Sequence, residues 1–327
     1  MELDEPFIKL PIQFCGKTLA SEVQALPDSA WVPHPTGFVG NEAVRLVTPG
    51  GRATDELEGP MAPTEYLLRC PYIMEVMAEL GGVWGRSRLM GLAAGADVPS
   101  HIDIHYYWRT HLRVHIPVIT NPGVTFTCGG ETVHMATGEC WVFDSFRRHG
   151  VHNGGPQRRI HLVIDTVGSE RIWDLISAPK PAETPGSTPV AMLPGQGKGE
   201  PLRFEQMNSP TVMTPWEMKA HIDFLAEQAV PDPMLEPVLR RLDRLLAGWA
   251  AAWAQFGPDE AGFATYRHLI ATVSRDLDTI GGGQVKLQNE RSFVYVLSQM
   301  VFARAVPRQA ENLAVAKRNL SSRRLAS

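Results

Sequence analysis

Residues 86–166 consist of short segments in which apolar and polar side chains alternate, and turns separate the segments. Two of them read RTHLRVHIPVI and RRIHLVID, and glycine turns such as GG and ATGE separate others. Successive side chains of a strand point to opposite faces, so alternation with a period of two is typical of strands with one buried face. Six or more such strands in a row favour an antiparallel barrel or jelly roll. The sequence therefore predicts a mainly β core over this region.

The sequence before this core is expected to flank the functional site and to take no part in it. Residues 1–62 mix short apolar runs with turn signals such as PHPTG and TPGG. Residues 64–81 carry apolar side chains in a pattern that ends at a glycine pair, and we expect a helix there in spite of Pro71. Residues 1–177 are therefore grouped as one jelly-roll domain with N-terminal flanking helices.

The sequence after the core changes character twice. Residues 178–203 are rich in proline and glycine and nearly free of large apolar side chains, which is the composition of a linker. Residues 204–327 are predicted to be all-α with about four helices, because apolar residues recur there at helical intervals, as in Val238, Leu242, Leu245 and Trp249. These apolar stripes must bury against one another, the β core, or a second copy in a homodimer.

Composition and charge exclude several classes of protein. A net charge of −4 provides no basic field for nucleic acid. The N-terminal MELDEPFIKL is acidic where a secretory signal is basic, and no window approaches the roughly 20 apolar residues of a membrane span. We therefore expect a cytoplasmic protein without nucleic-acid or membrane partners. The four cysteines are widely spaced and form no CxxC pair, which argues against a disulfide framework and a thiolate zinc site.

Histidine is concentrated in one part of the chain, since eight of the eleven histidines lie between positions 101 and 161. The stretch 99–117 reads PSHIDIHYYWRTHLRVHIP. In an extended strand, one face would carry four basic side chains, which are those of Arg109, His111, Arg113 and His115. Buried positive charge is costly unless an anion or a metal compensates it. The pattern therefore predicts an anionic ligand.

His101 and Asp103 are two residues apart, which places an imidazole and a carboxylate on one side of a strand or strand end. His149 follows the strand CWVFD by a short loop, and an antiparallel return would bring it beside His101. Two histidines and one carboxylate suit Fe(II) and leave coordination positions open. The same spacing in His221 and Asp223 falls in an expected helix, where the two side chains point apart, and predicts no site.

Four segments, in this order and spacing, resemble the aspartyl/asparaginyl β-hydroxylase family of Fe(II)/2-oxoglutarate-dependent oxygenases: PSHID, RVHIPVITNP, GECWVFDSFRRHGVHN and RRIHLVID. The resemblance covers about residues 86–168 and is nearest to bacterial, cis-proline-hydroxylase-like members that carry an HxD motif. It implies a double-stranded β-helix, that is, a jelly-roll or cupin-like core. It also implies Fe(II), 2-oxoglutarate as co-substrate and O2.

The resemblance implies metal ligation by His101, Asp103 and His149. It implies that Arg159, ten residues after the distal histidine, salt-bridges the far carboxylate of 2-oxoglutarate. The animal branch of the family has a glycine in place of Asp103, so the complete triad sets this chain apart from it. Met90 stands near the position where that branch offers a serine to the co-substrate.

The family's RxH pair, which holds the 2-oxoglutarate carboxylate nearer the metal, matches Arg113 and His115 best, because the strand then continues into IP. Arg109 and His111 show the same RxH pattern and remain a second choice. Some further residues are candidates for contacting the substrate or supporting the ligands, and they are Arg109, His111, His152, Tyr107 and Trp108.

The expected function is hydroxylation of an amino acid, or of an amino-acid side chain within a peptide or protein, by a 2-oxoglutarate-dependent dioxygenase. Two alternatives stay open at this point. One is a metal cupin enzyme that uses no 2-oxoglutarate, and the other is a non-catalytic binding module on a jelly-roll scaffold. Arg159 and the RxH motif argue against the first alternative, because arginine binds planar carboxylates through two parallel hydrogen bonds. The intact triad of His101, Asp103 and His149 argues against the second.

Overall fold

The computed structural model describes residues 3–178, 190–197 and 199–307. It divides into two compact units. The first comprises the described residues up to Asp103 together with those of Tyr107–Asn208, and the second comprises Ile104–Tyr106 with the described residues from Ser209 onward. Residues 179–189 of the expected linker lie outside the described residues.

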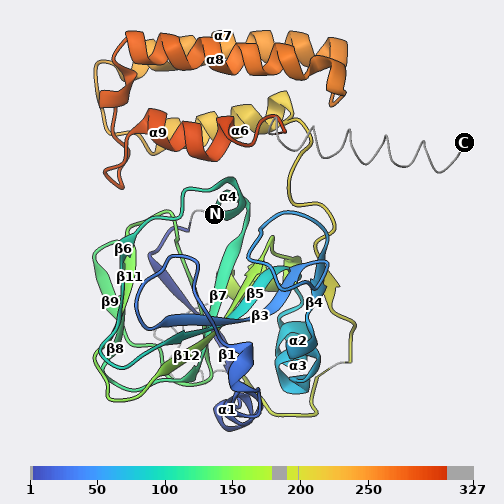
Figure 1. Ribbon diagram of the computed structural model, residues 1–327. Coiled ribbons are helices and arrows are strands. Elements are labelled where there is room, and N and C mark those ends of the chain that lie inside the picture. The colour runs from blue at the N-terminus through green and yellow to red at the C-terminus, as the bar shows by residue number, and fades with distance from the viewer. Residues whose placement is uncertain (1–2, 179–189, 198, 308–327) are drawn as a thin grey trace, which may run out of the picture. The chain divides into compact units, whose positions relative to one another are not determined.

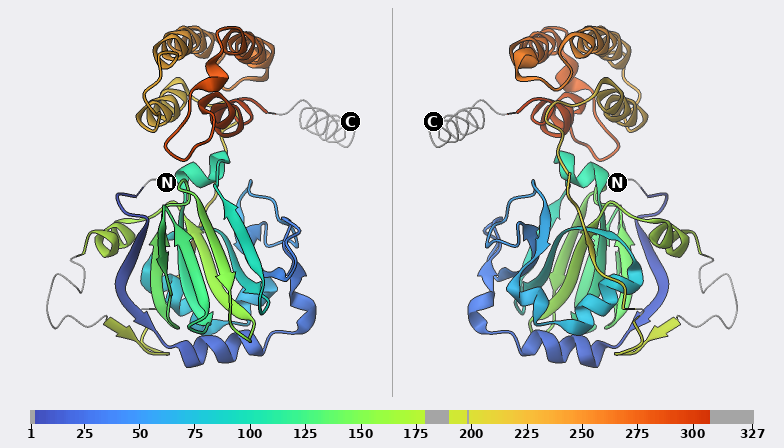
Figure 2. Two further views of the ribbon diagram at one scale, coloured as in Figure 1. Left: turned by 90° about the vertical axis from the view of Figure 1, so that its left-hand side faces the viewer. Right: turned by 90° about the vertical axis from the view of Figure 1, so that its right-hand side faces the viewer.

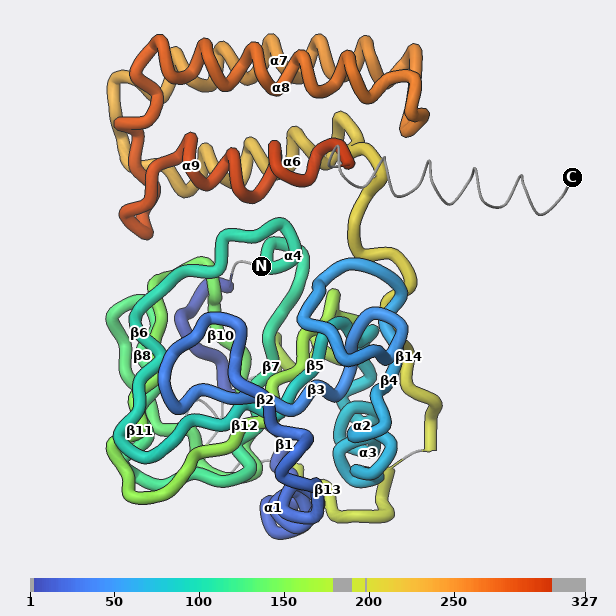
Figure 3. Tube along the Cα trace, in the orientation of Figure 1, coloured from blue at the N-terminus to red at the C-terminus, as the bar shows by residue number. Residues whose placement is uncertain are grey.

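The first unit is built on two antiparallel sheets between which the chain alternates, as Figure 3 allows the reader to follow. The large sheet contains the order β10-β7-β12-β5, and its strands are β5 (Val83–Leu92), β7 (Leu112–Ile119), β10 (Glu139–Phe143) and β12 (Arg159–Thr166). The small sheet has the order β6-β11-β8-β9, with β6 (Asp97–His101), β8 (Val124–Cys128), β9 (Glu131–Val133) and β11 (His149–Asn153). This arrangement is a double-stranded β-helix, and the expected jelly roll is confirmed.

Strands from outside this core extend the large sheet at both edges. On one side, β1 (Phe7–Phe14) pairs with β10. On the other, β3 (Asn41–Pro49) pairs with β5, and β2 (Val32–Pro33) and β4 (Met61–Pro63) pair with β3. Part of the proline- and glycine-rich stretch also joins this sheet, because β13 (Val190–Met192) pairs with β1 and β14 (Arg203–Phe204) pairs with β5.

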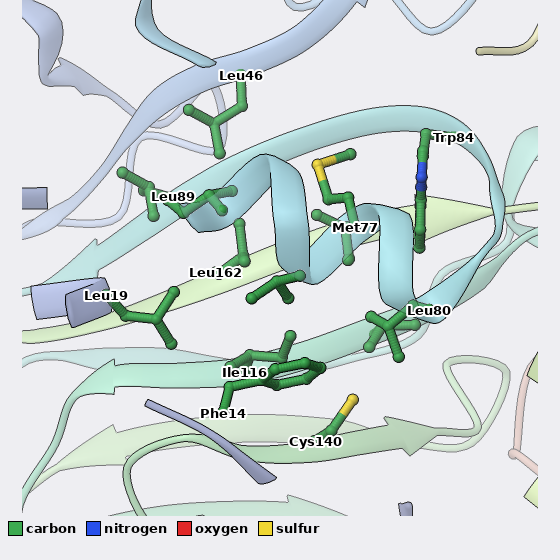
Figure 4. Packing of buried hydrophobic residues seen from close by; sticks show 14 of the residues in the cluster. Phe14, Leu19, Leu46, Met77, Leu80, Trp84, Leu89, Ile116, Cys140 and Leu162 are labelled. Atoms are coloured by element: carbon green, nitrogen blue, oxygen red, sulfur yellow. The ribbon is translucent and has the colours of Figure 1, made fainter. Parts of the chain in front are cut away.

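Helices cover the face of the large sheet that points away from the small one, as the two views of Figure 2 show for the blue and cyan helices. These helices are α1 (Gly16–Gln24), α2 (Glu65–Leu68) and α3 (Pro71–Leu80). Figure 4 shows Met77 and Leu80 of α3 in the same buried cluster as Leu89 of β5 and Leu162 of β12. The other face of these strands is therefore free to line a cavity. The prediction of a single helix over 64–81 is wrong. The helix is interrupted before Pro71, which is the first residue of α3.

The second unit is helical, as predicted. Its helices are α6 (Pro215–Glu227), α7 (Leu235–Phe256), α8 (Phe263–Thr279) and α9 (Phe293–Leu297), and a π-helical turn, η4 (Ser298–Phe302), continues α9. Figure 1 shows α7 and α8 side by side along their length. The predicted apolar stripe of α7 is fully buried, and it consists of Val238, Leu242, Leu245 and Trp249. No helix in the described ranges is long and apolar enough to cross a membrane. A homodimer formed through these helices stays a prediction.

Asn153 ties the end of β11 to its neighbours and is fully buried. Its amide nitrogen donates to the carbonyl oxygens of Leu92 at 3.0 Å, Ala93 at 3.0 Å and Gln157 at 2.8 Å. Its amide oxygen accepts a hydrogen bond from the backbone of Gly155 at 3.2 Å. The side chain thus fixes the turn between β11 and β12, both of which carry candidate site residues.

We expect Asn153→Leu to destabilise the first unit by about 2–4 kcal/mol, because it leaves buried carbonyl groups without their donors. Hydrogen exchange measured on peptides from 83–92 and 149–166 would report on this unit without interference from the helices. His152→Ala, on the same strand but half exposed, is the control and should change stability by less than about 1 kcal/mol. Equal effects of the two substitutions would contradict this role for Asn153.

Candidate metal centre

His101, Asp103 and His149 come together at the end of the small sheet. Antiparallel pairing of β6 with β11 places His149 directly opposite His101, and their ring centroids are 4.2 Å apart. Asp103 follows β6, where its backbone N–H donates to the carbonyl of Ser145 at 3.1 Å. One ligand atom from each of the three side chains lies within 4.8 Å of the others. The expected antiparallel return of His149 to His101 is confirmed.

Hydrogen bonds orient both imidazoles of this cluster. Nδ1 of His101 donates to the carbonyl of Pro99 at 2.8 Å, and Nδ1 of His149 donates to the carbonyl of Arg147 at 2.9 Å. Each Nε2 therefore keeps its lone pair, and the two atoms lie 4.0 and 3.9 Å from the carboxylate oxygens of Asp103. Nε2 of His149 is buried and has no hydrogen-bond partner among the described residues. A carboxylate and two oriented imidazoles fit a divalent transition metal.

The protonation states also suit metal binding. Burial lowers the pKa of His149 to about 4, so its imidazole is neutral near pH 7. Burial would raise the pKa of Asp103, but Arg113, His149 and His101 outweigh that effect and hold it below its usual value. Arg113 donates to the Asp103 carboxylate at 2.9 Å and fixes its orientation. His149 and Asp103 therefore need no proton loss before they bind a cation.

The cluster opens into a cavity of about 340 Å³ between the two sheets. The large sheet contributes Arg113 and His115 from β7 and Arg159 from β12 to its wall. Arg159 is 4% exposed, its Nε has no hydrogen-bond partner in the described part of the chain, and burial lowers its pKa to about 9. Both ring nitrogens of His115 are likewise buried without a described partner. The cavity thus offers an arginine and a neutral imidazole to an anionic ligand.

Arg113 differs from Arg159 because its charge is already compensated. It donates to Asp103 and, through Nε, to Asp165 at 3.1 Å. Its guanidinium lies over the ring of Trp108, 3.9 Å from the centroid, and Trp108 also lines the cavity. Arg113 is therefore placed to hold the carboxylate of Asp103 while it faces the cavity.

The expected strand face with four basic residues is wrong. Arg109 belongs to the short helix α4 (Tyr106–Thr110), and β7 begins only at Leu112, so neither Arg109 nor His111 lines the cavity. His111 stays outside because its Nδ1 lies 2.6 Å from the carbonyl oxygen of Tyr107 and its Nε2 lies 2.7 Å from the Glu205 carboxylate. Of the two RxH pairs, only Arg113 and His115 line the cavity.

Two other candidates also lie away from the cavity wall. Tyr107 is buried in the core, and its hydroxyl accepts a hydrogen bond from the backbone N–H of Arg86 at 2.8 Å. His152 is half exposed and pairs with Asp97 at 2.7 Å, three residues along the strand from His149. Of the aromatic pair, only Trp108 reaches the cavity.

Sequence reasoning missed several cavity residues. Arg86 and Arg88 line it from β5, and their alternation in RSRLM was a usable signal that both lie on one face of a strand. His34 and Asp55 line it from the N-terminal region, where nothing in the local sequence pointed to them. The expectation that residues 1–62 lie outside the site is therefore wrong, because the segments around β3 pass along β5 at the cavity.

Comparison with known proteins finds a family similarity for part of this chain. Residues 58–168 match the family model described as Aspartyl/Asparaginyl beta-hydroxylase. The L-proline cis-4-hydroxylase of Rhizobium meliloti (strain 1021) is 29% identical over 79 residues, which are 24% of this chain and 28% of that protein. The chain therefore aligns with less than a third of that relative's length.

Two solved structures are similar to part of this chain, at low sequence identity. A 2OG-Fe(II) oxygenase family oxidoreductase from Burkholderia pseudomallei is 14% identical with a TM-score of 0.40, covering 50% of this chain and 86% of that one. A Pseudomonas putida prolyl-4-hydroxylase is 12% identical with a TM-score of 0.37, covering 51% of this chain and 94% of that one. The family model spans in full all eight strands that alternate between the two sheets, β5 to β12, and includes the His101, Asp103 and His149 cluster. The match to the aspartyl/asparaginyl β-hydroxylase family model thus covers the part of the chain that holds this cluster.

Proposed function

We propose that this protein is a non-haem Fe(II)- and 2-oxoglutarate-dependent dioxygenase that hydroxylates an amino acid, free or within a peptide or protein. One observation carries the proposal. A cluster of two imidazoles and a carboxylate shares a single cavity with a buried arginine and a neutral imidazole that have no described partner. The similarity to an L-proline cis-4-hydroxylase supports the same reading and makes a free amino acid the first substrate class to test.

In this proposal, His101, Asp103 and His149 hold Fe(II) through two Nε2 atoms and one carboxylate. The bonds from Nδ1 of each histidine to a backbone carbonyl keep the rings in place, and Arg113 keeps the carboxylate anionic and oriented. With iron bound, the site would use O2 as the oxidant: 2-oxoglutarate would give up two electrons and CO2 and take one oxygen atom to become succinate, and the other oxygen atom would be inserted into a C–H bond of the substrate.

Arg113, His115 and Arg159 bind 2-oxoglutarate in this proposal. Arg159 pairs with the carboxylate far from the metal through two parallel hydrogen bonds, which compensates its buried charge. His115 can donate one hydrogen bond because burial, with Arg159 and Arg113 nearby, lowers its pKa well below the usual value and keeps it neutral. Arg113 adds positive charge at the end of the cavity near Asp103.

Incubation with Fe(II), 2-oxoglutarate and O2 tests the proposal, with succinate measured by mass spectrometry. We expect succinate to form slowly without substrate and faster with a member of a panel of amino acids and short peptides that begins with L-proline. An enzyme that binds Fe(II) but not 2-oxoglutarate would support a metal cupin of another chemistry. A protein that binds ligands from the panel and forms no succinate under any condition would support a binding module.

A further inference from the structure

Arg86 and Arg88 form a second group of cations in the cavity. Both lie on one face of β5, both line the cavity, and their side chains are 8% and 9% exposed. Nε of Arg86 and Nη1 of Arg88 are buried without a hydrogen-bond partner in the described ranges. An arginine that is nine-tenths buried and faces a cavity with an unused donor indicates a missing anion.

The carboxylates nearest to these two arginines are already engaged elsewhere. Asp165 lies 3.9 Å from Nε of Arg86, but it accepts a hydrogen bond from Arg113 at 3.1 Å. Asp55 lies 3.9 Å from Nη1 of Arg88, but it accepts a hydrogen bond from Nε of Arg45 at 3.0 Å. Burial lowers the pKa of Arg88 well below its usual value, and the charges of Arg86 and Arg113 lower it further. The pair is therefore short of negative charge.

The charges in and beside the cavity give the same result. In the described part of the chain, five arginines meet three carboxylates there, namely Arg45, Arg86, Arg88, Arg113 and Arg159 with Asp55, Asp103 and Asp165. This leaves two positive charges. A divalent metal and a dianionic 2-oxoglutarate cancel each other, so the same two positive charges remain for another ligand.

Strand register separates Arg88 from His115 and Arg159, two of the residues proposed to bind 2-oxoglutarate. Arg88 pairs with Val163 on one side of β12, and His115 pairs with the same residue on the other side. The two backbones are therefore two strand spacings apart, about 10 Å. Arg159 pairs with Leu92, four residues along β5 from Arg88, which corresponds to about 13 Å along the strand. One small dicarboxylate held by Arg159 and His115 leaves Arg86 and Arg88 for a second ligand.

We propose that Arg86 and Arg88 bind the carboxylate of the substrate, which is a small, carboxylate-bearing amino acid. This inference rests on the proposed function and specifies its substrate class. The cavity volume of about 340 Å³ is at the lower end of the range for ligand pockets and must also hold 2-oxoglutarate, which favours a small substrate. Trp108, with its ring centroid 4.9 Å from the Arg86 guanidinium, supports that group from the side.

The test measures binding without turnover. The protein is loaded with Mn(II) and 2-oxoglutarate and titrated calorimetrically with the common amino acids, each beside its α-carboxamide, and with capped peptides of aspartate and glutamate. We expect at least one acid to bind and its carboxamide to bind about 30-fold more weakly or worse, as expected for loss of a desolvated charge pair. If only side-chain carboxylates bind, including those in capped peptides, the bound group is the side-chain carboxylate.

Substitutions then assign the binding to the arginine pair. Arg88→Leu and Arg86→Leu should each weaken binding of the amino acid by about 30-fold or more and change the affinity for 2-oxoglutarate by less than about threefold. Retained 2-oxoglutarate binding also shows that a variant is folded, and Arg88→Lys, which keeps the charge without the planar fork, should have an intermediate effect. Arg158→Leu is the control, because Arg158 is ion-paired with Glu42 and does not line the cavity.

Three outcomes would overturn this inference. In the first, carboxamides bind as tightly as acids, or no acid binds although 2-oxoglutarate does. This result contradicts the inference but leaves the proposed function intact. In the second, Arg88→Leu weakens the binding of 2-oxoglutarate more than the binding of the amino acid, which would mean that the arginine pair binds the co-substrate. In the third, the parent protein binds no 2-oxoglutarate, and the proposed function and this inference both fail.

Discussion

Replacing His149 by alanine is expected to weaken Fe(II) binding by more than about 100-fold and to abolish succinate formation, because even residues that only orient metal ligands contribute about 10–100-fold. The physical reason is the position of its Nε2, which is buried, points to the Asp103 carboxylate and has no described hydrogen-bond partner. Retained iron, measured by metal analysis after gel filtration in the absence of oxygen, gives the result independently of turnover. Asp103→Ala should lose iron in the same way.

His152→Ala is the matched control for this prediction. His152 belongs to the same strand as His149, but it is half exposed and paired with Asp97, so its removal should leave iron content unchanged. Iron lost from the His152 variant and kept by the His149 variant would show that the metal is bound by a different set of residues. Loss from both variants with a lowered thermal stability would point to damage to β11 in place of a ligand role.

The candidate metal ligands could be predicted because their geometry follows from local pattern. His101 and Asp103 are two residues apart at a strand end, and the turn signals around CWVFD fix an antiparallel return that brings His149 opposite His101. Alternation also predicted that Arg113 and His115 share one face, and both line the cavity. Such inferences need only the period of a strand and the direction of its neighbour.

The prediction was wrong where a tertiary contact decides the local structure. The segment before β7 alternates as a strand does, yet residues 106–110 form a helical turn. The buried ring of Tyr107 stacks on His111, and Glu205, almost a hundred residues away in sequence, pairs with His111 at 2.7 Å. No local pattern contains that partner. The same reason applies to Asp55 and His34, which reach the cavity through the pairing of β3 with β5.

Arg86 and Arg88 are a different case, because the sequence held their signal and it was not used. Both alternate with inward-facing residues of β5, as Arg113 and His115 do in β7. A strand that places two arginines on the face toward a cluster of metal ligands is as informative as the RxH pair. The pattern could locate these two cations. Only the structure shows that Asp55 and Asp165 are hydrogen-bonded to other arginines, so that the charges of Arg86 and Arg88 stay uncompensated.

Arg159→Leu is expected to raise the dissociation constant for 2-oxoglutarate by about 30-fold to 1000-fold, since removing one partner of a desolvated charge pair costs about 2–5 kcal/mol. Binding is measured by calorimetry on the Mn(II)-loaded protein, so the result does not depend on turnover or on knowing the substrate. Arg159 carries this effect because it is 4% exposed, faces the cavity and has an Nε without a described partner. Arg159→Lys should recover only part of the affinity, because an ammonium group cannot make two parallel hydrogen bonds.

Arg158→Leu provides a control one residue away. Arg158 directly precedes β12, where it pairs with Glu42 at 2.8 Å and its guanidinium lies 3.6 Å from the ring centroid of Trp31. Its removal should leave the 2-oxoglutarate affinity within about threefold of the parent, since a half-exposed ion pair contributes about 1 kcal/mol at most. A strong effect of Arg158→Leu with none from Arg159→Leu would mean that the face of β12 toward the cavity does not bind the co-substrate. The anion expected there would then have to be held by Arg86 and Arg88, and the roles proposed for the two arginine groups would be exchanged.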